Sequence, residues 1–174
     1  GSEIIGFMSP FKYIHNIQSL AERELTTFSM ELVPRISRAQ RMDALSAMNS
    51  AAGYKAVLLA ASRLNKFFPL MMTAAGTILP AKVLVIGAGV AGLQAIATAK
   101  RLGARVKAFD TRPIVKEQVE SLGAEFVSLE TSRDAETAGG YAEEMTEDFY
   151  RYEHAIIGEH LPDTDAVITR IRIR

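Results

Sequence analysis

The sequence predicts an α/β fold, in which a doubly wound parallel sheet follows part of a second α/β lobe and a long connecting helix. From Lys82 onward, short apolar strands alternate with helices of about ten residues, which is the pattern of βαβ units. Leu-Gly-Ala occurs at 102–104 and again at 122–124, where glycine suits the left-handed end of a helix. A helical apolar pattern covers residues 39–64. A chain of 174 residues is long enough to bury one sizeable core.

Residues 1–38 are expected to be the remnant of a first lobe. Their apolar stretches are short, and Pro10 and Pro34 interrupt them, so the segment lacks the sustained periodicity of a complete domain. Within this segment we expect a helix over residues 17–25 and a strand over residues 26–32.

Residues 39–80 are expected to form the connecting helix and a linker. Ser37 and Gln40 match the capping box, in which a serine and a glutamine three residues later satisfy the free amides at a helix start. A helix should therefore begin there and continue through the apolar pattern. Gly53 is a weak point in this helix, because glycine costs about 1 kcal/mol relative to alanine. The prolines and small residues of 67–80 predict a connecting segment.

Residues 81–174 are expected to form the parallel-sheet lobe. The expected elements, in order, are strand 83–86, helix 90–101, strand 105–109, helix 113–121, strand 125–129, helix 141–160 and strand 165–169. The polar segment 132–140 predicts a loop, and residues 170–174 alternate Arg and Ile like an edge strand or a tail. A complete doubly wound domain has a second set of strands, so the C-terminal strands are expected to be missing.

Composition and charge exclude several classes of function. There are 20 Lys and Arg and 20 Asp and Glu, so the chain lacks the net positive charge with which nucleic-acid-binding proteins attract phosphates. Cysteine is absent, which excludes disulfides and thiol nucleophiles. The three histidines lack the spacing of metal ligands, so no metal site is expected. Glycines and polar residues interrupt the uncharged stretch 83–99, so no direct membrane span is expected.

The glycine-rich segment 87–92 matches the G-x-G-x-x-G pattern of dinucleotide-binding βαβ units. It follows an apolar strand and opens a helix, and Asp110 ends the next strand 21 residues after Gly89. Gly87 would make the tight turn, Gly89 would let the backbone approach a pyrophosphate, and Gly92 would let helix and strand pack closely. The fold class is therefore Rossmann-like, though incomplete. The candidate cofactor-binding residues of this motif are Gly87, Ala88, Gly89, Val90 and Gly92.

Asp110 favours NAD over NADP as the dinucleotide. Its carboxylate would accept hydrogen bonds from the hydroxyl groups of the adenosine ribose and would repel a 2′-phosphate. Arg112 leaves an alternative open, because its guanidinium could bind that phosphate. Arg112 could equally be a solvated side chain before Pro113. We expect NAD.

A second group of polar residues lies at the start of the long helix. Gln40, Asp43 and Ser46 are three residues apart and would fan over about a third of the helix circumference, with Arg35 just upstream. Ordinary structural roles explain these residues as well. Gln40 can complete the capping box, Asp43 can be a favourable charge near the helix start, and Ser46 can be a small packing residue. Taken alone, these roles are the better explanation.

Five segments of the chain together resemble a known protein family. They are PRISRAQ (34–40), MTAAGT (72–77), GAGVAGLQAIATAKRLGA (87–104), KEQVESLGA (116–124) and AGGYA (138–142). The chain is similar, from about residue 4 to residue 169, to the NAD(H)-binding component of proton-translocating nicotinamide nucleotide transhydrogenase, its alpha subunit. The resemblance implies two Rossmann-like lobes with NAD(H) in the cleft between them.

The resemblance also implies the reaction and the partners. Hydride passes from NADH to NADP+ on a separate NADP(H)-binding component, and a membrane proton-channel component couples the transfer to proton translocation. The implied location is the cytoplasmic face of the bacterial inner membrane or the matrix side of the mitochondrial membrane, with the protein bound peripherally. Members of the family dimerise through this component, so a homodimer is expected.

By matching position, the resemblance assigns the nicotinamide end to the start of the long helix. Arg35, Asp43 and Ser46 would hold it, and Gln40 would lie where the two nicotinamide rings meet. Direct hydride transfer needs apposed rings in a dry, oriented site rather than an acid or a base. The candidate catalytic residues are Arg35, Gln40 and Asp43. The candidate cofactor-binding residues here are Arg35, Ile36, Ser37, Arg38, Gln40, Asp43 and Ser46.

The resemblance assigns the adenosine end to the sheet lobe. Asp110, Thr111 and Arg112 would surround the ribose, and the loop that contains Gly140 and Tyr141 would close over the nucleotide. Because family members continue with further strands, the chain is expected to be truncated at both ends. We therefore expect it to bind NAD(H) weakly and to be inactive alone.

Two other functions remain open from the sequence. One is an oxidoreductase like alanine dehydrogenase, whose NAD lobe is similar, and the other is a non-catalytic nucleotide-binding or assembly module. The family's Ser-Ser pair after the aspartate is Ser46-Ala47 here, which keeps the first serine. The segments RISRAQ and AGGYA favour transhydrogenase over alanine dehydrogenase.

Overall fold

The computed structural model describes residues 2–128 and 147–169. The chain forms two compact units, Gly1–Ala51 and Ala52–Arg174. The finer division expected at residues 38 and 80 stays a prediction. Within the described ranges, no helix is long and apolar enough to span a bilayer, and no cluster of His, Asp or Glu side chains could hold a metal ion.

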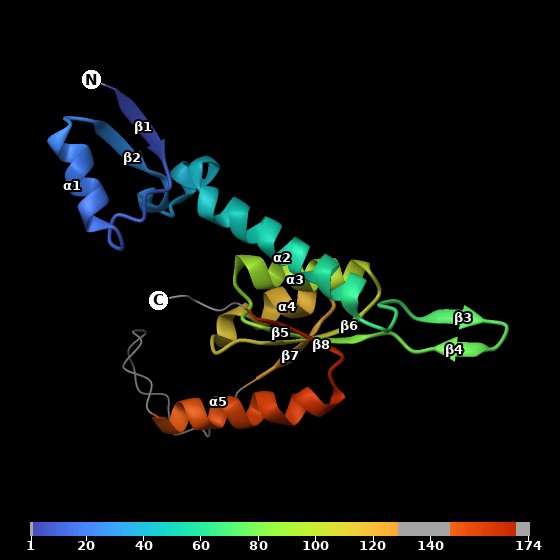
Figure 1. Ribbon diagram of the computed structural model, residues 1–174. Coiled ribbons are helices and arrows are strands. Elements are labelled where there is room, and N and C mark those ends of the chain that lie inside the picture. The colour runs from blue at the N-terminus through green and yellow to red at the C-terminus, as the bar shows by residue number, and fades with distance from the viewer. Residues whose placement is uncertain (1, 129–146, 170–174) are drawn as a thin grey trace. The chain divides into compact units, whose positions relative to one another are not determined.

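The first unit opens with a small βαβ arrangement (Figure 1). Strand β1 (Glu3–Gly6) pairs in parallel with β2 (Thr26–Ser29), and helix α1 (Ile14–Glu22) connects them. The helix expected at 17–25 is present but begins and ends three residues earlier, and a 3-10 helix, Met30–Leu32, replaces the end of the expected strand. The sequence did not predict β1, because a four-residue strand is recognisable only through its distant partner.

The connecting helix differs from its prediction at its start. Residues Ser37–Met42 form a 3-10 helix, and α-helix α2 runs over Ala44–Arg63. The capping-box prediction is wrong, because no side chain caps the 3-10 helix. Asp43 instead caps α2, since its Oδ1 accepts a hydrogen bond from the Ser46 backbone N–H at 2.9 Å.

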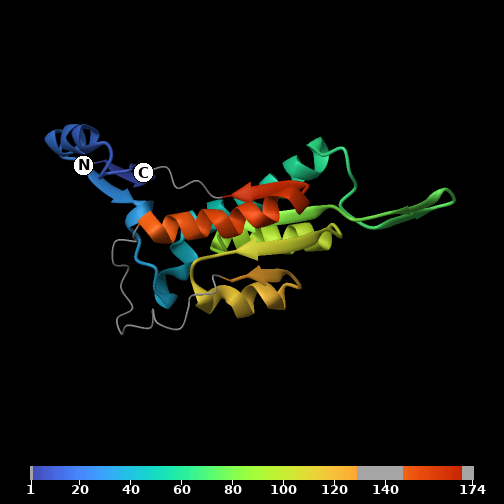
Figure 2. The same cartoon turned by 90° about the horizontal axis from the view of Figure 1, so that it is seen from below.

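The second unit contains a parallel sheet with the strand order β7-β6-β5-β8. The strands are β5 (Lys82–Ile86), β6 (Arg105–Phe109), β7 (Glu125–Val127) and β8 (Ala166–Thr169). The connecting helices are α3 (Val90–Arg101), α4 (Lys116–Ser121) and α5 (Glu147–His160). Helices α3 and α4 cover one face and α5 covers the other, as Figures 1 and 2 show from two directions. The doubly wound α/β prediction is confirmed, and the order reverses beside β5, where such folds bind ligands.

The core of the second unit lies between this sheet and its helices. Strand β5 has three successive apolar residues with at most 2% exposure, Val83, Leu84 and Val85, because helices cover both faces of the sheet. Val57 of α2 and Ile96 of α3 are fully buried in the same unit. The strand therefore reads as a continuous apolar run rather than an alternating one.

Most expected element bounds in this unit agree with the structure. Helix 90–101 and strand 105–109 are confirmed residue for residue. The helix expected at 113–121 begins with a 3-10 turn, Pro113–Val115. Both Leu-Gly-Ala glycines have positive φ, +90° at Gly103 and +78° at Gly123, as helix ends of this kind require. The loop 132–140, the helix start at 141–146 and the tail 170–174 lie outside the described residues.

The linker contains a hairpin that the sequence did not predict. Strands β3 (Met71–Thr73) and β4 (Gly76–Ile78) pair antiparallel, and all six of their residues are exposed. Three-residue strands without a buried face carry no alternation of apolar and polar residues, so sequence periodicity cannot reveal them.

Candidate functional site

The glycine-rich turn connects β5 to α3 at the carboxyl edge of the sheet. Gly87 has a φ of +93°, which favours glycine, and its N–H donates to the Phe109 carbonyl oxygen at 2.7 Å. A Cβ on Gly92 would lie 1.8 Å from the Gly87 carbonyl oxygen, so only glycine fits there. Gly89 is the N-cap of α3, and no side chain within residues 2–128 and 147–169 caps the helix. The first amides of α3 are therefore available to an anion.

Asp110 follows β6 and lies beside this turn. Its side chain is only 7% exposed, and its Oδ2 accepts a hydrogen bond from the Ala88 backbone N–H at 2.7 Å. The first and second strands of the βαβ unit thus bring the glycine turn and the carboxylate into direct contact. The 21-residue spacing between Gly89 and Asp110 is typical of dinucleotide-binding βαβ units.

Arg112 binds the same carboxylate through its backbone and its side chain. The backbone N–H and Nε of Arg112 donate to Asp110 Oδ1, both at 2.9 Å, and Nη2 donates to Oδ2 at 3.0 Å. Burial alone would raise the pKa of the Asp110 carboxyl, but the Arg112 hydrogen bonds, the Ala88 N–H and the Arg112 charge hold its pKa below the ordinary value. Asp110 is therefore a carboxylate at neutral pH.

The sequence left two roles open for Arg112, and the structure has a third arrangement. The Arg112 side chain is 57% exposed, yet its guanidinium is fixed side-on against Asp110 rather than free in solvent. Thr111, between the two, is half-buried. No sequence signal predicts this ion pair, because residues two apart meet only when the turn after the strand folds the chain back.

Asp43 is the centre of the polar group in the first unit. Ser46 donates to it twice, through its backbone N–H to Oδ1 at 2.9 Å and through Oγ to Oδ2 at 2.6 Å. These hydrogen bonds, with a contribution from the positive charge of Arg35, lower the pKa of the Asp43 carboxyl. Ser46 thus contacts Asp43 directly, whereas Arg35 acts on this carboxyl through its charge.

The expected arrangement of Gln40, Asp43 and Ser46 on one helix is wrong. Gln40 lies in the 3-10 helix, and Asp43 interrupts the helical backbone with a ψ of 76°. Only Ser46 belongs to α2. Ser46 is also more than a packing residue, because it satisfies both oxygens of Asp43. Five candidate side chains of this segment are exposed to solvent, namely Arg35, Ile36, Ser37, Arg38 and Gln40. Gly140 and Tyr141 lie outside the described residues.

Sequence reasoning misjudged Gly53. A Cβ on this residue of α2 would lie 2.1 Å from the Ala91 carbonyl oxygen in the first turn of α3. Gly53 is therefore a close-approach residue rather than a weak point, because it lets α2 pack against the helix that carries the glycine turn. The sequence signal for this close contact was a glycine inside a long helical pattern, which often has a packing reason.

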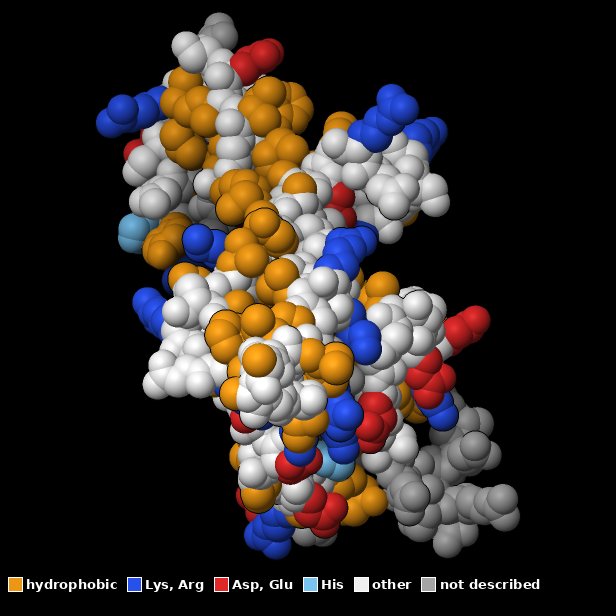
Figure 3. All heavy atoms as spheres, turned by 90° about the vertical axis from the view of Figure 1, so that its right-hand side faces the viewer, with side chains coloured by type: hydrophobic (Ala, Val, Ile, Leu, Met, Phe, Trp, Pro, Cys, Tyr) orange, Lys and Arg blue, Asp and Glu red, His pale blue; other side chains and the backbone are white. Residues whose placement is uncertain are grey.

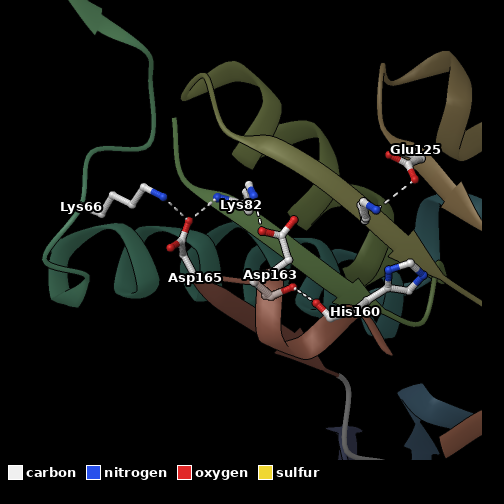
Figure 4. A network of polar contacts seen from close by, with 8 residues as sticks. Lys66, Lys82, Glu125, His160, Asp163 and Asp165 are labelled. Atoms are coloured by element: carbon white, nitrogen blue, oxygen red, sulfur yellow. Dashed lines mark hydrogen bonds and ion pairs between the residues drawn. The ribbon is translucent and has the colours of Figure 1, made fainter. Parts of the chain in front are cut away.

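A polar network also escaped sequence reasoning, at the opposite, amino edge of the sheet (Figure 4). Asp165 accepts from the Lys66 Nζ at 2.7 Å and from the Lys82 backbone N–H at 2.8 Å, and Lys82 also pairs with Asp163. Lys107 pairs with Glu125 at 3.1 Å on neighbouring strands. These contacts join the amino ends of the strands and leave the glycine turn and Asp110 at the other edge.

Comparison with known proteins identifies the family. The model of the alanine dehydrogenase/PNT C-terminal domain matches residues 56–174, and that of the N-terminal domain matches residues 1–52. The chain is 55% identical over 155 residues to an NAD(P) transhydrogenase subunit alpha protein of Rhodospirillum rubrum, covering 88% of this chain and 40% of that protein. It is 49% identical to the protein of the same name from Rickettsia prowazekii, covering 99% of this chain and 45% of the relative.

A solved structure agrees with these matches. The transhydrogenase from Sinorhizobium meliloti superimposes with a TM-score of 0.83 at 48% identity, covering 96% of this chain and 44% of that one. The chain thus spans less than half the length of these relatives. The resemblance drawn from the five sequence segments is confirmed, and the chain belongs to the alanine dehydrogenase/PNT family.

Proposed function

We propose that this chain is an NAD(H)-binding part of proton-translocating NAD(P) transhydrogenase. In this function, hydride passes from NADH to NADP+ on a partner component, and the transfer is coupled to proton translocation. The observation that carries the proposal is the contact between Asp110 and the Ala88 N–H in the glycine turn. The 55% identity to a transhydrogenase alpha subunit supports it over an alanine dehydrogenase, to which the family description applies equally.

The residues of the second unit fit the adenosine half of NAD(H). The uncapped amides of α3 suit the pyrophosphate, the left-handed Gly87 makes the tight turn before them, and Gly92 lets that turn pack closely against α3. The Asp110 carboxylate is an acceptor for ribose hydroxyl groups. Its negative charge also disfavours a 2′-phosphate, so the proposed nucleotide is NAD(H), with NADP(H) bound by the partner component.

The polar group of the first unit fits the nicotinamide end. When bound, NADH supplies the hydride. Asp43, held ionised by Ser46 and Arg35, can accept a hydrogen bond from a carboxamide N–H, and Arg35 can donate to its oxygen. The exposed Gln40 is assigned to the position where two nicotinamides meet. The assignments of Ile36, Ser37, Arg38, Thr111, Gly140 and Tyr141 rest on the resemblance.

A homodimer is part of the proposal. The β3–β4 hairpin exposes Met72 at 81%, and Leu79, the residue after β4, is 61% exposed. Figure 3 shows hydrophobic side chains around the hairpin. A two-stranded hairpin is marginally stable in water by itself. At its base lies a mostly apolar pocket lined by residues that include Leu64, Phe67 and Leu102. A second copy would cover both features by a self-complementary contact.

The remaining partners and the location follow from the proposed role. They are the NADP(H)-binding component and the membrane proton-channel component of the enzyme. The chain would act at the cytoplasmic face of a bacterial inner membrane or at the matrix side of a mitochondrial membrane.

Paired titrations with NADH and NADPH test this function. Calorimetry on the full chain should give saturable binding of NADH that is stronger than binding of NADPH. Asp110→Asn should weaken NADH binding by roughly tenfold, because it removes the charge that strengthens the ribose hydrogen bonds. Glu117→Gln, which neutralises an acid at the start of α4, is the matched control and should bind as the wild type does. Equal binding of both nucleotides, or none, would refute the proposal.

A further inference from the structure

The Asp110 carboxylate has no free acceptor position in this structure. A carboxylate offers about four lone-pair sites on its two oxygens. Oδ1 accepts from the backbone N–H and the Nε of Arg112, and Oδ2 accepts from the Ala88 N–H and the Nη2 of Arg112. A ribose that donates to Asp110 must therefore take the place of a donor that is already there.

We propose that the Arg112 side chain occupies the ribose position on Asp110 and must leave it when NAD(H) binds, so that Arg112 sets both the affinity and the nucleotide preference of the site. The inference rests on the proposed NAD(H)-binding function. It assigns Arg112 the role of an internal competitor, which differs from that of a residue that contacts the nucleotide.

Only the guanidinium can give way. The Ala88 and Arg112 N–H groups belong to the backbone of the glycine turn and of the turn after β6, and Asp110 is almost fully buried. The Arg112 side chain, by contrast, is 57% exposed, so solvent can hydrate it as it leaves. Asp110 keeps two backbone hydrogen bonds after the exchange and is not stranded as an unpaired buried charge.

The geometry matches the group that would replace the guanidinium. Nε and Nη2 place two parallel donors on the two oxygens at 2.9 and 3.0 Å. The vicinal 2′- and 3′-hydroxyl groups of a ribose supply the same two donors. A ribose that carries a 2′-phosphate supplies one donor and a negative charge, so it replaces the guanidinium poorly.

The exchange has a consequence for the preference between the two nucleotides. In the wild type, NADH binding must break the two hydrogen bonds that the exposed Arg112 side chain makes to the nearly buried Asp110 carboxylate. Without the Arg112 side chain, NADH meets an open carboxylate, and a 2′-phosphate meets that carboxylate without the Arg112 charge that neutralises it. Loss of the side chain therefore favours NADH and disfavours NADPH.

Calorimetric titration of the wild type, Arg112→Ala and Arg112→Lys with NADH and NADPH tests the inference. Arg112→Ala should lower the NADH dissociation constant about two- to fivefold and raise the NADPH value. Arg112→Lys, which keeps the charge but loses the fork, should lie between the two proteins. Arg101→Ala removes an exposed arginine at the end of α3 and should match the wild type. Weaker NADH binding by Arg112→Ala would overturn the inference, because it would make Arg112 a nucleotide-contacting residue. Unchanged binding would overturn it too, because a competitor must weaken binding while it is present.

A spectroscopic readout separates this inference from the proposed function. The ¹⁵N resonance of the Arg112 Nε–H should move from a hydrogen-bonded to a solvent-exposed position when NADH saturates the protein. Saturable NADH binding with an unmoved Arg112 resonance would refute the competitor role and leave the function standing. Absence of NADH binding in every variant would refute both.

Discussion

Replacement of Gly53 by alanine tests how α2 packs against α3. Helix propensity favours the alanine by roughly 0.5–1 kcal/mol, so sequence reasoning predicts a more stable protein. In the structure, however, the new Cβ would lie 2.1 Å from the Ala91 carbonyl oxygen and 2.9 Å from its carbon. Because real Cβ contacts with backbone stay beyond 3.0 Å, α2 and α3 must separate by about 1 Å.

The magnitude follows from the two opposing effects. Overpacking of a core contact costs about 1–3 kcal/mol, which exceeds the propensity gain. We expect Gly53→Ala to lower the free energy of unfolding by roughly 1–2 kcal/mol in urea denaturation monitored by circular dichroism. The matched control is Gly158→Ala in α5, where a Cβ meets no atom within 4 Å.

The two substitutions should therefore have opposite signs. Gly158→Ala should raise the free energy of unfolding by roughly 0.5–1 kcal/mol, because only helix propensity changes. If Gly53→Ala stabilises the protein as much as Gly158→Ala does, the close packing of α2 on α3 is refuted.

Three further predictions concern pH, the amino edge of the sheet and the hairpin. The pKa of Asp110 is lowered in the folded chain, so the stability that its carboxylate contributes is present above the unfolded pKa of about 3.9 and is lost as the pH falls through the folded value. The free energy of unfolding, measured by acid titration, should therefore fall less below about pH 4 in Asp110→Asn than in the wild type. Asp165→Ala should lower the free energy of unfolding in urea by about 1–3 kcal/mol, because it leaves the partly buried Lys82 N–H without its acceptor. The control Glu147→Ala removes an exposed i,i+4 ion pair and should change this free energy by less than about 0.5 kcal/mol. Met72→Asp should shift a dimer toward monomer in analytical ultracentrifugation, and an unchanged sedimentation coefficient would contradict the role of the hairpin.

Local signals explain which parts of the fold the sequence predicts well. The bounds of α3 and β6 agree residue for residue, because a glycine turn begins the helix and Gly103 ends it. These signals lie within the elements themselves. The parallel sheet also follows from the βαβ pattern, whereas the pairing of β8 with β5 depends on contacts between segments distant in the sequence.

Other parts depend on competition or on distant contacts. Two N-terminal caps were available before α2, Ser37 and Asp43, and the chain uses Asp43, whose two oxygens Ser46 satisfies. Gln40 then lies in the 3-10 helix, Asp43 between the two helices and Ser46 in α2. Their three-residue spacing therefore does not place them on one helix face. The Arg112–Asp110 pair likewise depends on the turn after β6 rather than on any periodicity.

Backbone amide NMR during an NADH titration tests the central claim most directly, because Ala88 and Arg112 donate their amides to the carboxylate assigned to the ribose. We expect these two resonances and those of Gly87 and Gly89 to shift saturably with NADH. The Lys82 amide, which donates to Asp165 at the opposite edge of the sheet, should stay in place. Unmoved resonances at the glycine turn, or shifts confined to the amino edge, would contradict the assignment of this turn as the NAD(H) site.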